Sequence, residues 1–214
     1  MVFLIRVFQG ALTLLLTLIV LLNILRVVKR FYHVPAPALA TRLLDNPLRR
    51  RFVQPPGEVA DRMRVEPGMD VVEIGPGKGS YTIEVARRVR PGGKVYAIDI
   101  QEAVVDYLWE RAEREGVDNL HPMVEDAYAM PFEDSTVDRV LMNAVLAEIP
   151  EPVRVLRECH RILKPDGLVC LCEMLPDPDY PLRRTERRWA KEAGLELREE
   201  FGNFFIYQLN FGKE

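Results

Sequence analysis

The feature that most constrains the fold is a regular alternation of strand-like and helix-like segments after residue 58. Short apolar runs typical of buried strands alternate with longer segments whose apolar residues recur every three or four positions. This alternation favours a mostly parallel sheet covered by helices on both faces, because each parallel connection needs a crossover. We therefore expect an α/β domain over residues 58–214, preceded by a turn at Pro55-Pro56-Gly57.

The expected sheet has seven strands. They are residues 70–74, 94–98, 120–124, 137–142, 168–172, 195–201 and 204–211. The expected helices are residues 80–89, 101–115, 152–163 and 182–193. Gly202-Asn203 links the last two strands, which predicts a C-terminal antiparallel hairpin.

The sharpest motif is VVEIGPGKGS, at residues 71–80. A strand runs into Glu73, a loop follows with glycines spaced G-x-G-x-G, and a helix then begins. Glycines allow the backbone to turn tightly and to approach a ligand closely, and the amides at a helix start favour an anion. The dinucleotide-binding fingerprint is incomplete, because its third glycine falls on Ser80.

Polar residues also end the next three predicted strands. Asp99 ends the second strand, where a carboxylate can accept two hydrogen bonds from ribose hydroxyls. Glu125-Asp126 follows the third strand and can accept from an adenine amino group. Asn143 ends the fourth. Each residue alone suits a helix cap or a solvated loop, but together they predict a ligand site at the carboxyl edge of the sheet.

These segments resemble class I S-adenosylmethionine-dependent methyltransferases, in particular the small family that includes quinone and lipid methyltransferases. The matching stretches are EIGPGKG, YAID, VEDAYAMPFEDSTVDRVLMNAVL and ECHRILKPDGLVCLCE. The resemblance covers about three quarters of the chain and implies a Rossmann-like fold and S-adenosylmethionine as cofactor.

The resemblance also implies roles for individual residues. Glu73 and the loop residues would hold the methionine part of the cofactor, Asp99 with Ile100 the ribose side, Asp126 and Ala127 the adenine, and Asn143 would lie beside the reactive sulfonium. The loop residues concerned are Gly75, Pro76, Gly77 and Gly79.

The catalytic residues are left unassigned. Many relatives carry a histidine after the fourth strand, whereas this chain reads Ala144-Val145-Leu146-Ala147-Glu148. Candidate bases are Glu148, Tyr128, Tyr32 and His33, and each of them suits a structural role better than a catalytic one. The three cysteines do not form a metal-ligand pattern, and we expect no metal, no nucleic-acid partner and buried thiols.

An uncharged run, VFQGALTLLLTLIVLLNIL, occupies residues 7–25 between two arginines. As a helix it spans roughly 28 Å, close to the hydrocarbon thickness of a bilayer. A buried core helix, a cleaved signal peptide and an interfacial helix are the alternatives. We expect a transmembrane anchor with its basic flank over residues 1–30 and a juxtamembrane linker over residues 31–57.

Basic residues follow this run far more than they precede it. Only Arg6 lies before it, whereas seven lysines and arginines lie between residues 26 and 51 against one acid. The positive-inside rule predicts a single-pass membrane protein whose catalytic domain is cytoplasmic. A second basic surface is predicted on the helix 182–193, with Arg183, Arg187 and Lys191 on one face, either solvated or touching anionic lipid.

The anchor suggests a hydrophobic or membrane-associated methyl acceptor, such as a lipid headgroup amine or a quinone. Two alternatives stay open: an anchored enzyme for a soluble small molecule, and a non-catalytic membrane-bound module that binds the cofactor. Intact strand-end residues argue against loss of catalysis. The oligomeric state and the acceptor atom are not predicted.

Overall fold

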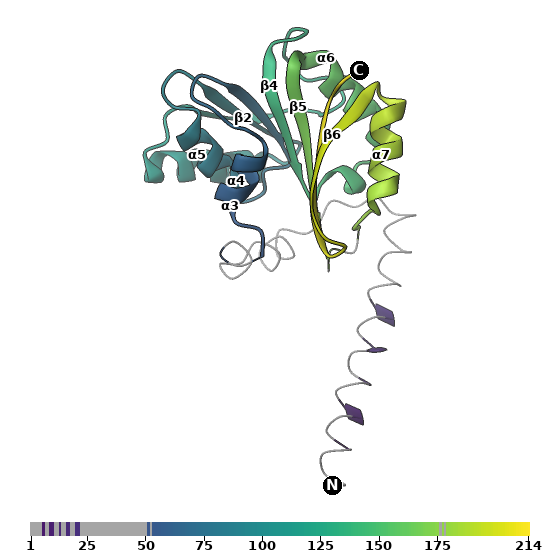
Figure 1. The fold of residues 1–214 in the computed structure, drawn as a ribbon. Coiled ribbons are helices and arrows are strands. Elements are labelled where there is room, and N and C mark those ends of the chain that lie inside the picture. Colours follow the sequence, from purple (N-terminus) through teal and green to yellow (C-terminus); the bar gives the residue numbers. More distant parts are fainter. Residues whose placement is uncertain are drawn as a thin grey trace. The chain divides into compact units, whose positions relative to one another are not determined.

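The structure is a computed structural model that describes residues 53–175, 177 and 179–214, with Arg51 and residues 6, 9, 10, 13, 16, 17, 20 and 21. The chain forms two compact units, Met1–Pro35 and Ala36–Glu214. The second unit contains a seven-stranded sheet in the order β3-β2-β1-β4-β5-β7-β6 (Figure 1).

The strands are β1 (Asp70–Ile74), β2 (Lys94–Asp99), β3 (Leu120–Val124), β4 (Val137–Asn143), β5 (Leu163–Met174), β6 (Leu195–Gly202) and β7 (Ile206–Lys213). The first five strands are parallel to one another, and β7 lies antiparallel between β5 and β6. Since β1 pairs with both β2 and β4, the topology reverses at β1, which is where ligands bind in such sheets.

Helices cover both faces of the sheet. The helices α3 (Pro56–Arg62), α4 (Ser80–Arg88) and α5 (Glu102–Glu115) share one apolar core. The helices α6 (Pro152–Ile162) and α7 (Arg183–Glu192) share the other. Alternate residues of β1 enter the two cores, Val71 the first and Val72 the second, as the period of a strand requires. The seven-stranded Rossmann-like α/β fold with its C-terminal hairpin, predicted from the sequence, is therefore confirmed.

Three local features differ from the expectations. Pro55-Pro56-Gly57 does not form a turn but starts α3, with proline in its first turn, where no helical N–H donor is needed. The strand β5 begins five residues early because Leu163 pairs with Val137 before the register shifts. The helical spacing of residues 182–193 lets Leu182, Thr185, Trp189 and Ala193 face the sheet, but in α7 the buried residues are Glu186 and Ala190, and Leu182 is exposed.

In the first unit the described residues are helical. Thr13 Oγ1 donates a hydrogen bond to the carbonyl O of Gln9 at 2.9 Å, and Thr17 Oγ1 donates to the carbonyl O of Thr13 at 2.9 Å. Within the described residues no helix has the length and apolar character needed to cross a membrane. Most of the anchor predicted at residues 7–25 lies outside those residues, and so do Tyr32 and His33.

Candidate functional site

The glycine loop joins β1 to α4 in a conformation that depends on missing side chains. The amide N–H of Gly75 donates to the carbonyl O of Ile98 at 2.9 Å, which ties the loop to the end of β2. A Cβ at Gly75 would lie 2.6 Å from Cγ2 of Val145, in the loop that follows β4. Glycine is therefore required here by packing within the protein, because the loops after β1 and β4 touch at this point.

Gly77 has a different role in the same loop. Its φ is +53°, and a Cβ built on it would meet no atom within 4 Å. The positive φ favours glycine at this position, and the open space around it leaves the backbone accessible to a ligand. Gly79 precedes α4, whose first amides lie beside this open backbone; such amides favour a carboxylate.

Charged residues predicted at the first two strand ends lie at the same edge of the sheet. Glu73 is almost fully buried near the end of β1. Asp99 ends β2, and its Oδ1 accepts the amide N–H of Gln101 at 2.9 Å. Burial raises the pKa of Asp99, and the amides of Gln101 and Ile100 oppose that shift. An acceptor fixed by backbone in this way can receive hydroxyl hydrogen bonds.

Two exposed apolar side chains flank Asp99. Ile100 is 64% exposed and Val124, at the end of β3, is 49% exposed. Asp99 and Val124 are register partners, so these side chains belong to adjacent strand ends. They provide an apolar surface on which a flat heterocycle can lie. The sequence analysis did not include Val124 in the site, although its position at the end of a predicted strand could have indicated it.

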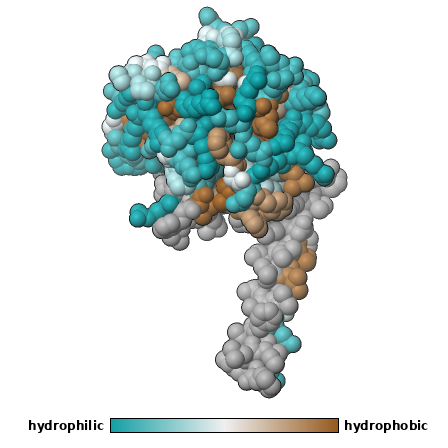
Figure 2. Space-filling model, in the orientation of Figure 1, coloured by the Kyte–Doolittle hydropathy of each residue, from teal (hydrophilic) through white to brown (hydrophobic). Residues whose placement is uncertain are grey.

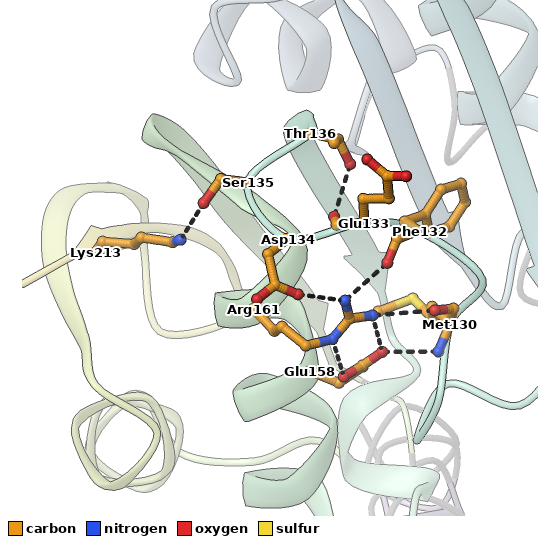
Figure 3. Close-up of polar contacts among 9 residues, drawn as sticks. All are labelled: Met130, Phe132, Glu133, Asp134, Ser135, Thr136, Glu158, Arg161 and Lys213. Atoms are coloured by element: carbon orange, nitrogen blue, oxygen red, sulfur yellow. Dashed lines mark hydrogen bonds and ion pairs between the residues drawn. The ribbon is translucent and has the colours of Figure 1, made fainter.

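Asp126 and Ala127 lie in the segment after β3. Asp126 Oδ1 accepts the amide N–H of Tyr128 at 2.9 Å, and this local turn leaves Asp126 exposed. Arg161 of α6 braces the continuation of this segment (Figure 3). Its guanidinium donates to the carbonyl O atoms of Met130 and Phe132 at 3.1 and 2.7 Å.

Glu158 completes the brace (Figure 3). One Glu158 oxygen accepts the amide N–H of Met130 at 2.8 Å, and both oxygens accept from Arg161, at 2.6 and 2.9 Å. These bonds lower the pKa of Glu158, with burial acting in the opposite direction. The loop that carries Asp126 and Ala127 is thus anchored to α6 through Arg161 and Glu158, and Arg161 also pairs with Asp134 of the same loop at 2.7 Å.

Asn143 ends β4, half-buried, beside Cys172 of β5. The next residue, Ala144, has a φ of +55°, which is uncommon for a residue with a side chain, and its N–H donates to the carbonyl O of Cys172 at 2.8 Å. Unusual backbone of this kind concentrates at functional sites. The positive φ of Ala144 could not be predicted from the sequence, because alanine is not a residue associated with this conformation.

An acidic cluster at the end of β5 was also missed. Glu173 and Asp177 are buried, and Glu186 reaches them from α7, where its exposed fraction is 0%. Burial raises the pKa of Glu173 well above its ordinary value, and the nearby charges of Glu186, Asp177 and Glu148 add to the shift. Burial likewise raises the pKa of Glu186 to about 8. Burial therefore favours the protonated form of both carboxyl groups.

Among the candidate bases within the described residues, Glu148 lies at the strand ends. It belongs to the short 3-10 helix η2 (Leu146–Glu148), and its charge acts on Glu173. The hydroxyl of Tyr128 accepts the amide N–H of Glu151 at 3.0 Å, which gives it a structural role. No group of His, Cys, Asp or Glu residues in the described part of the chain could hold a metal ion. The three cysteines are buried.

Comparison with known proteins agrees with this architecture. Residues 65–198 match the sequence model of the methyltransferase domain family. A demethylmenaquinone methyltransferase of Geobacillus stearothermophilus is 32% identical over 123 residues, which are 57% of this chain and 53% of that protein. The corresponding enzyme of Listeria welshimeri is 30% identical over 121 residues, 56% and 51% of the two chains. The matches span about half the length of these relatives.

Solved structures share the fold. A SAM-dependent methyltransferase from Aquifex aeolicus superposes with a TM-score of 0.76 at 25% identity, over 83% of this chain and 98% of that one. A TehB-like methyltransferase from Corynebacterium glutamicum, at 17% identity and a TM-score of 0.64, covers 82% of this chain and 96% of its own, and it supports the fold alone. Because the family match covers more than half of the chain and includes the glycine loop, Asp99, Asp126 and Asn143, this chain belongs to the S-adenosylmethionine-dependent methyltransferase domain family.

Proposed function

We propose that this chain transfers a methyl group from S-adenosylmethionine to a quinone-like acceptor carried in a membrane. The observation that carries the proposal is the convergence of the open backbone at Gly77 with Asp99, Asp126 and Asn143 on one edge of the sheet. The relatives named demethylmenaquinone methyltransferase support the quinone-like acceptor.

The residues present fit this cofactor. Open backbone at Gly77 and the start of α4 suit the carboxylate of its methionine part. Asp99 suits the ribose hydroxyls, and the exposed apolar side chains of Ile100 and Val124 suit contact with an adenine ring. Asn143, which ends β4 next to the unusual backbone of Ala144, suits the region where the methyl group is presented.

The protein's main task in such a reaction is alignment. Bound S-adenosylmethionine supplies a methyl group that is already activated by a positively charged sulfur. Holding the acceptor in line can contribute an effective molarity on the order of 10⁵ M or more. The acceptor loses one proton as the new bond forms, and Glu148 is the described candidate base at the strand ends.

Membrane association is part of the same proposal. The uncharged run at residues 7–25 has the length of a bilayer span, and basic residues follow it, which favours a cytoplasmic catalytic domain. The Thr13 and Thr17 hydroxyls bond within their own helix, which is how such groups are accommodated in lipid. Removing residues 1–30 should sharply lower activity on an embedded acceptor and lower it much less on a short soluble analogue.

The test uses the full chain in phosphatidylcholine and phosphatidylethanolamine vesicles and cofactor labelled in its methyl group. The vesicles are prepared with and without demethylmenaquinone that dithionite keeps in its quinol form, because the sulfonium methyl group needs an electron-rich ring as its nucleophile. We expect label in the quinone and none in the phospholipid, and Asp99→Ala should abolish most of the transfer. Label in phosphatidylethanolamine instead would identify a headgroup amine as the acceptor. Tight cofactor binding without transfer to either would favour a non-catalytic module.

A further inference from the structure

The turn between β6 and β7 presents two adjacent phenylalanines to the exterior. Phe204 and Phe205 are each 62% exposed, and Leu182, just before α7, is 42% exposed. Arg183 Nη2 donates to the carbonyl O of Asn203 at 2.6 Å, which ties the start of α7 to this turn. We call Phe204, Phe205 and Leu182 the tip patch. Figure 2 shows apolar surface at the end of the domain where this hairpin turns.

The backbone of the turn is fixed by the rest of the fold. The amide N–H of Leu175 donates to the carbonyl O of Phe205 at 2.8 Å, and the Tyr180 hydroxyl donates to that of Phe204. Asn203 Oδ1 accepts the amide N–H of Phe205 at 2.8 Å. The hairpin is therefore held in place through its backbone while two large apolar side chains remain outside the core. Adjacent exposed aromatic residues of this kind mark contact surfaces.

The tip patch lies at the same edge of the sheet as the cofactor site. Met174, the last residue of β5, pairs with Ile206, the first residue of β7. The turn between β6 and β7 therefore lies beside the carboxyl end of the parallel strand β5. Gln54, which comes just before α3, lies at this edge as well. The Tyr81 hydroxyl, in the first turn of α4, donates to Gln54, whose carbonyl O and Oε1 both lie 3.0 Å away.

We propose that the tip patch inserts into the interfacial layer of the lipid bilayer and turns the cofactor edge towards the membrane, an inference that rests on the proposed function. The chain that follows the uncharged run at residues 7–25 reaches this edge at Gln54. Arg184 is exposed in the first turn of α7, and Arg49–Arg51 precede the domain, which suits anionic headgroups. The anchor supplies affinity and the tip patch supplies orientation.

The experiment places one fluorophore at the tip of the full chain. The native cysteines are buried, so Phe205→Cys can be labelled selectively with an environment-sensitive dye. Leu197→Cys is the matched control, an exposed apolar position at the other end of the same hairpin. In phosphatidylcholine and phosphatidylglycerol vesicles that contain nitroxide-labelled lipid, quenching at position 205 should exceed that at position 197 by at least about twofold.

A second measurement uses the double variant Phe204→Ser/Phe205→Ser. Its KM for the vesicle-embedded acceptor should rise about fivefold or more, because the acceptor edge is no longer held at the bilayer. Its affinity for S-adenosylmethionine, measured by calorimetry, should not change, and Leu197→Ser should leave both quantities unchanged.

Equal quenching at the two labelled positions would overturn the inference. Protection of position 205 from aqueous iodide in the absence of vesicles would overturn it too, since a second copy of the chain would then cover the patch. Calorimetry separates this failure from failure of the proposed function. A chain that binds S-adenosylmethionine but shows an unquenched tip refutes only the bilayer contact, whereas a chain that does not bind it refutes the proposed function.

Discussion

Carboxylates at two parts of the carboxyl edge of the sheet differ in their burial and in their access to a ligand. At the ends of β2 and β3, Asp99 and Asp126 are held by backbone amides and stay accessible, so a ligand can reach them. At the end of β5, Glu173 and Glu186 face each other in the interior, and burial raises the pKa of both. Asp99 and Asp126 in the first part can therefore accept hydrogen bonds from a ligand. In the second part, burial favours protonation of Glu173 and Glu186, which lowers the charge of their buried contact.

The largest effect is expected on cofactor affinity, from a substitution in the first part of the edge. Asp99→Ala removes a charged acceptor of two ribose hydroxyl bonds, each worth about 1.5–3 kcal/mol before competition with water. We expect S-adenosylmethionine to bind at least about tenfold more weakly in calorimetry, with an unchanged melting temperature. Asp106→Ala, an exposed carboxylate on α5, is the control. Unchanged affinity in Asp99→Ala would remove Asp99 from the cofactor site.

The next effect tests the second part through pH. The folded-state pKa of Glu186, about 8, lies above its unfolded value, so the folded state binds the extra proton between about pH 4.5 and 8. Stability from this group is present below that window and is lost as pH rises through it. Glu186→Gln is always neutral and should reduce the fall in melting temperature between pH 6 and pH 9 by about 5 °C.

Glu192→Gln serves as the control for this experiment, because Glu192 is exposed on the same helix. A parallel fall in the melting temperature of wild type and Glu186→Gln would mean that Glu186 is ionised in the fold.

A smaller effect concerns the contacts of Arg161 that hold the loop of the first part to α6. Arg161→Ala frees the loop that leads from Asp126 to β4, because the guanidinium no longer holds Met130 and Phe132. We expect a melting temperature lower by about 3–6 °C and cofactor binding about threefold weaker, the cost of reordering the loop. Arg157→Ala, on the exposed side of α6, should change neither. A drop in melting temperature without weaker binding would show that the adenine side does not depend on the brace.

The smallest effect is expected on the outer surface of the second part. Arg187 pairs with Glu200, but its side chain is 46% exposed, and exposed ion pairs contribute about 0–1 kcal/mol. Arg187→Ala should lower the melting temperature by less than about 2 °C in differential scanning calorimetry. A larger drop would show that Glu200, which also binds Arg183, needs both partners to hold α7 on the hairpin.

The same division explains what the sequence could predict. The glycine loop, Asp99, Asp126 and Asn143 each follow a short apolar run, so strand periodicity locates them without any knowledge of distant contacts. The family and the order of elements followed from these segments and are confirmed. The individual cofactor contacts and the anchor stay predictions.

Glu186 could not be found in that way. It lies in a helix with basic residues on several sides, where a glutamate has the pattern of a solvated ion pair. Its burial depends on packing against Glu173 of β5 and Tyr207 of β7, and the spacing of residues within the helix does not reveal those contacts. The position of Val145 against Gly75 was likewise hidden, since it results from the meeting of two loops about seventy residues apart.

The place of β7 between β5 and β6 has a consequence for synthesis. The strand β7 is the last of the seven to leave the ribosome, yet it fills an interior position of the sheet. Until it emerges, β5 exposes an unpaired edge rich in valine, leucine and cysteine, and an edge of that kind can pair with another nascent chain. The sheet therefore closes late, and the interval between the emergence of β5 and that of β7 is the most hazardous one for the folding of this domain.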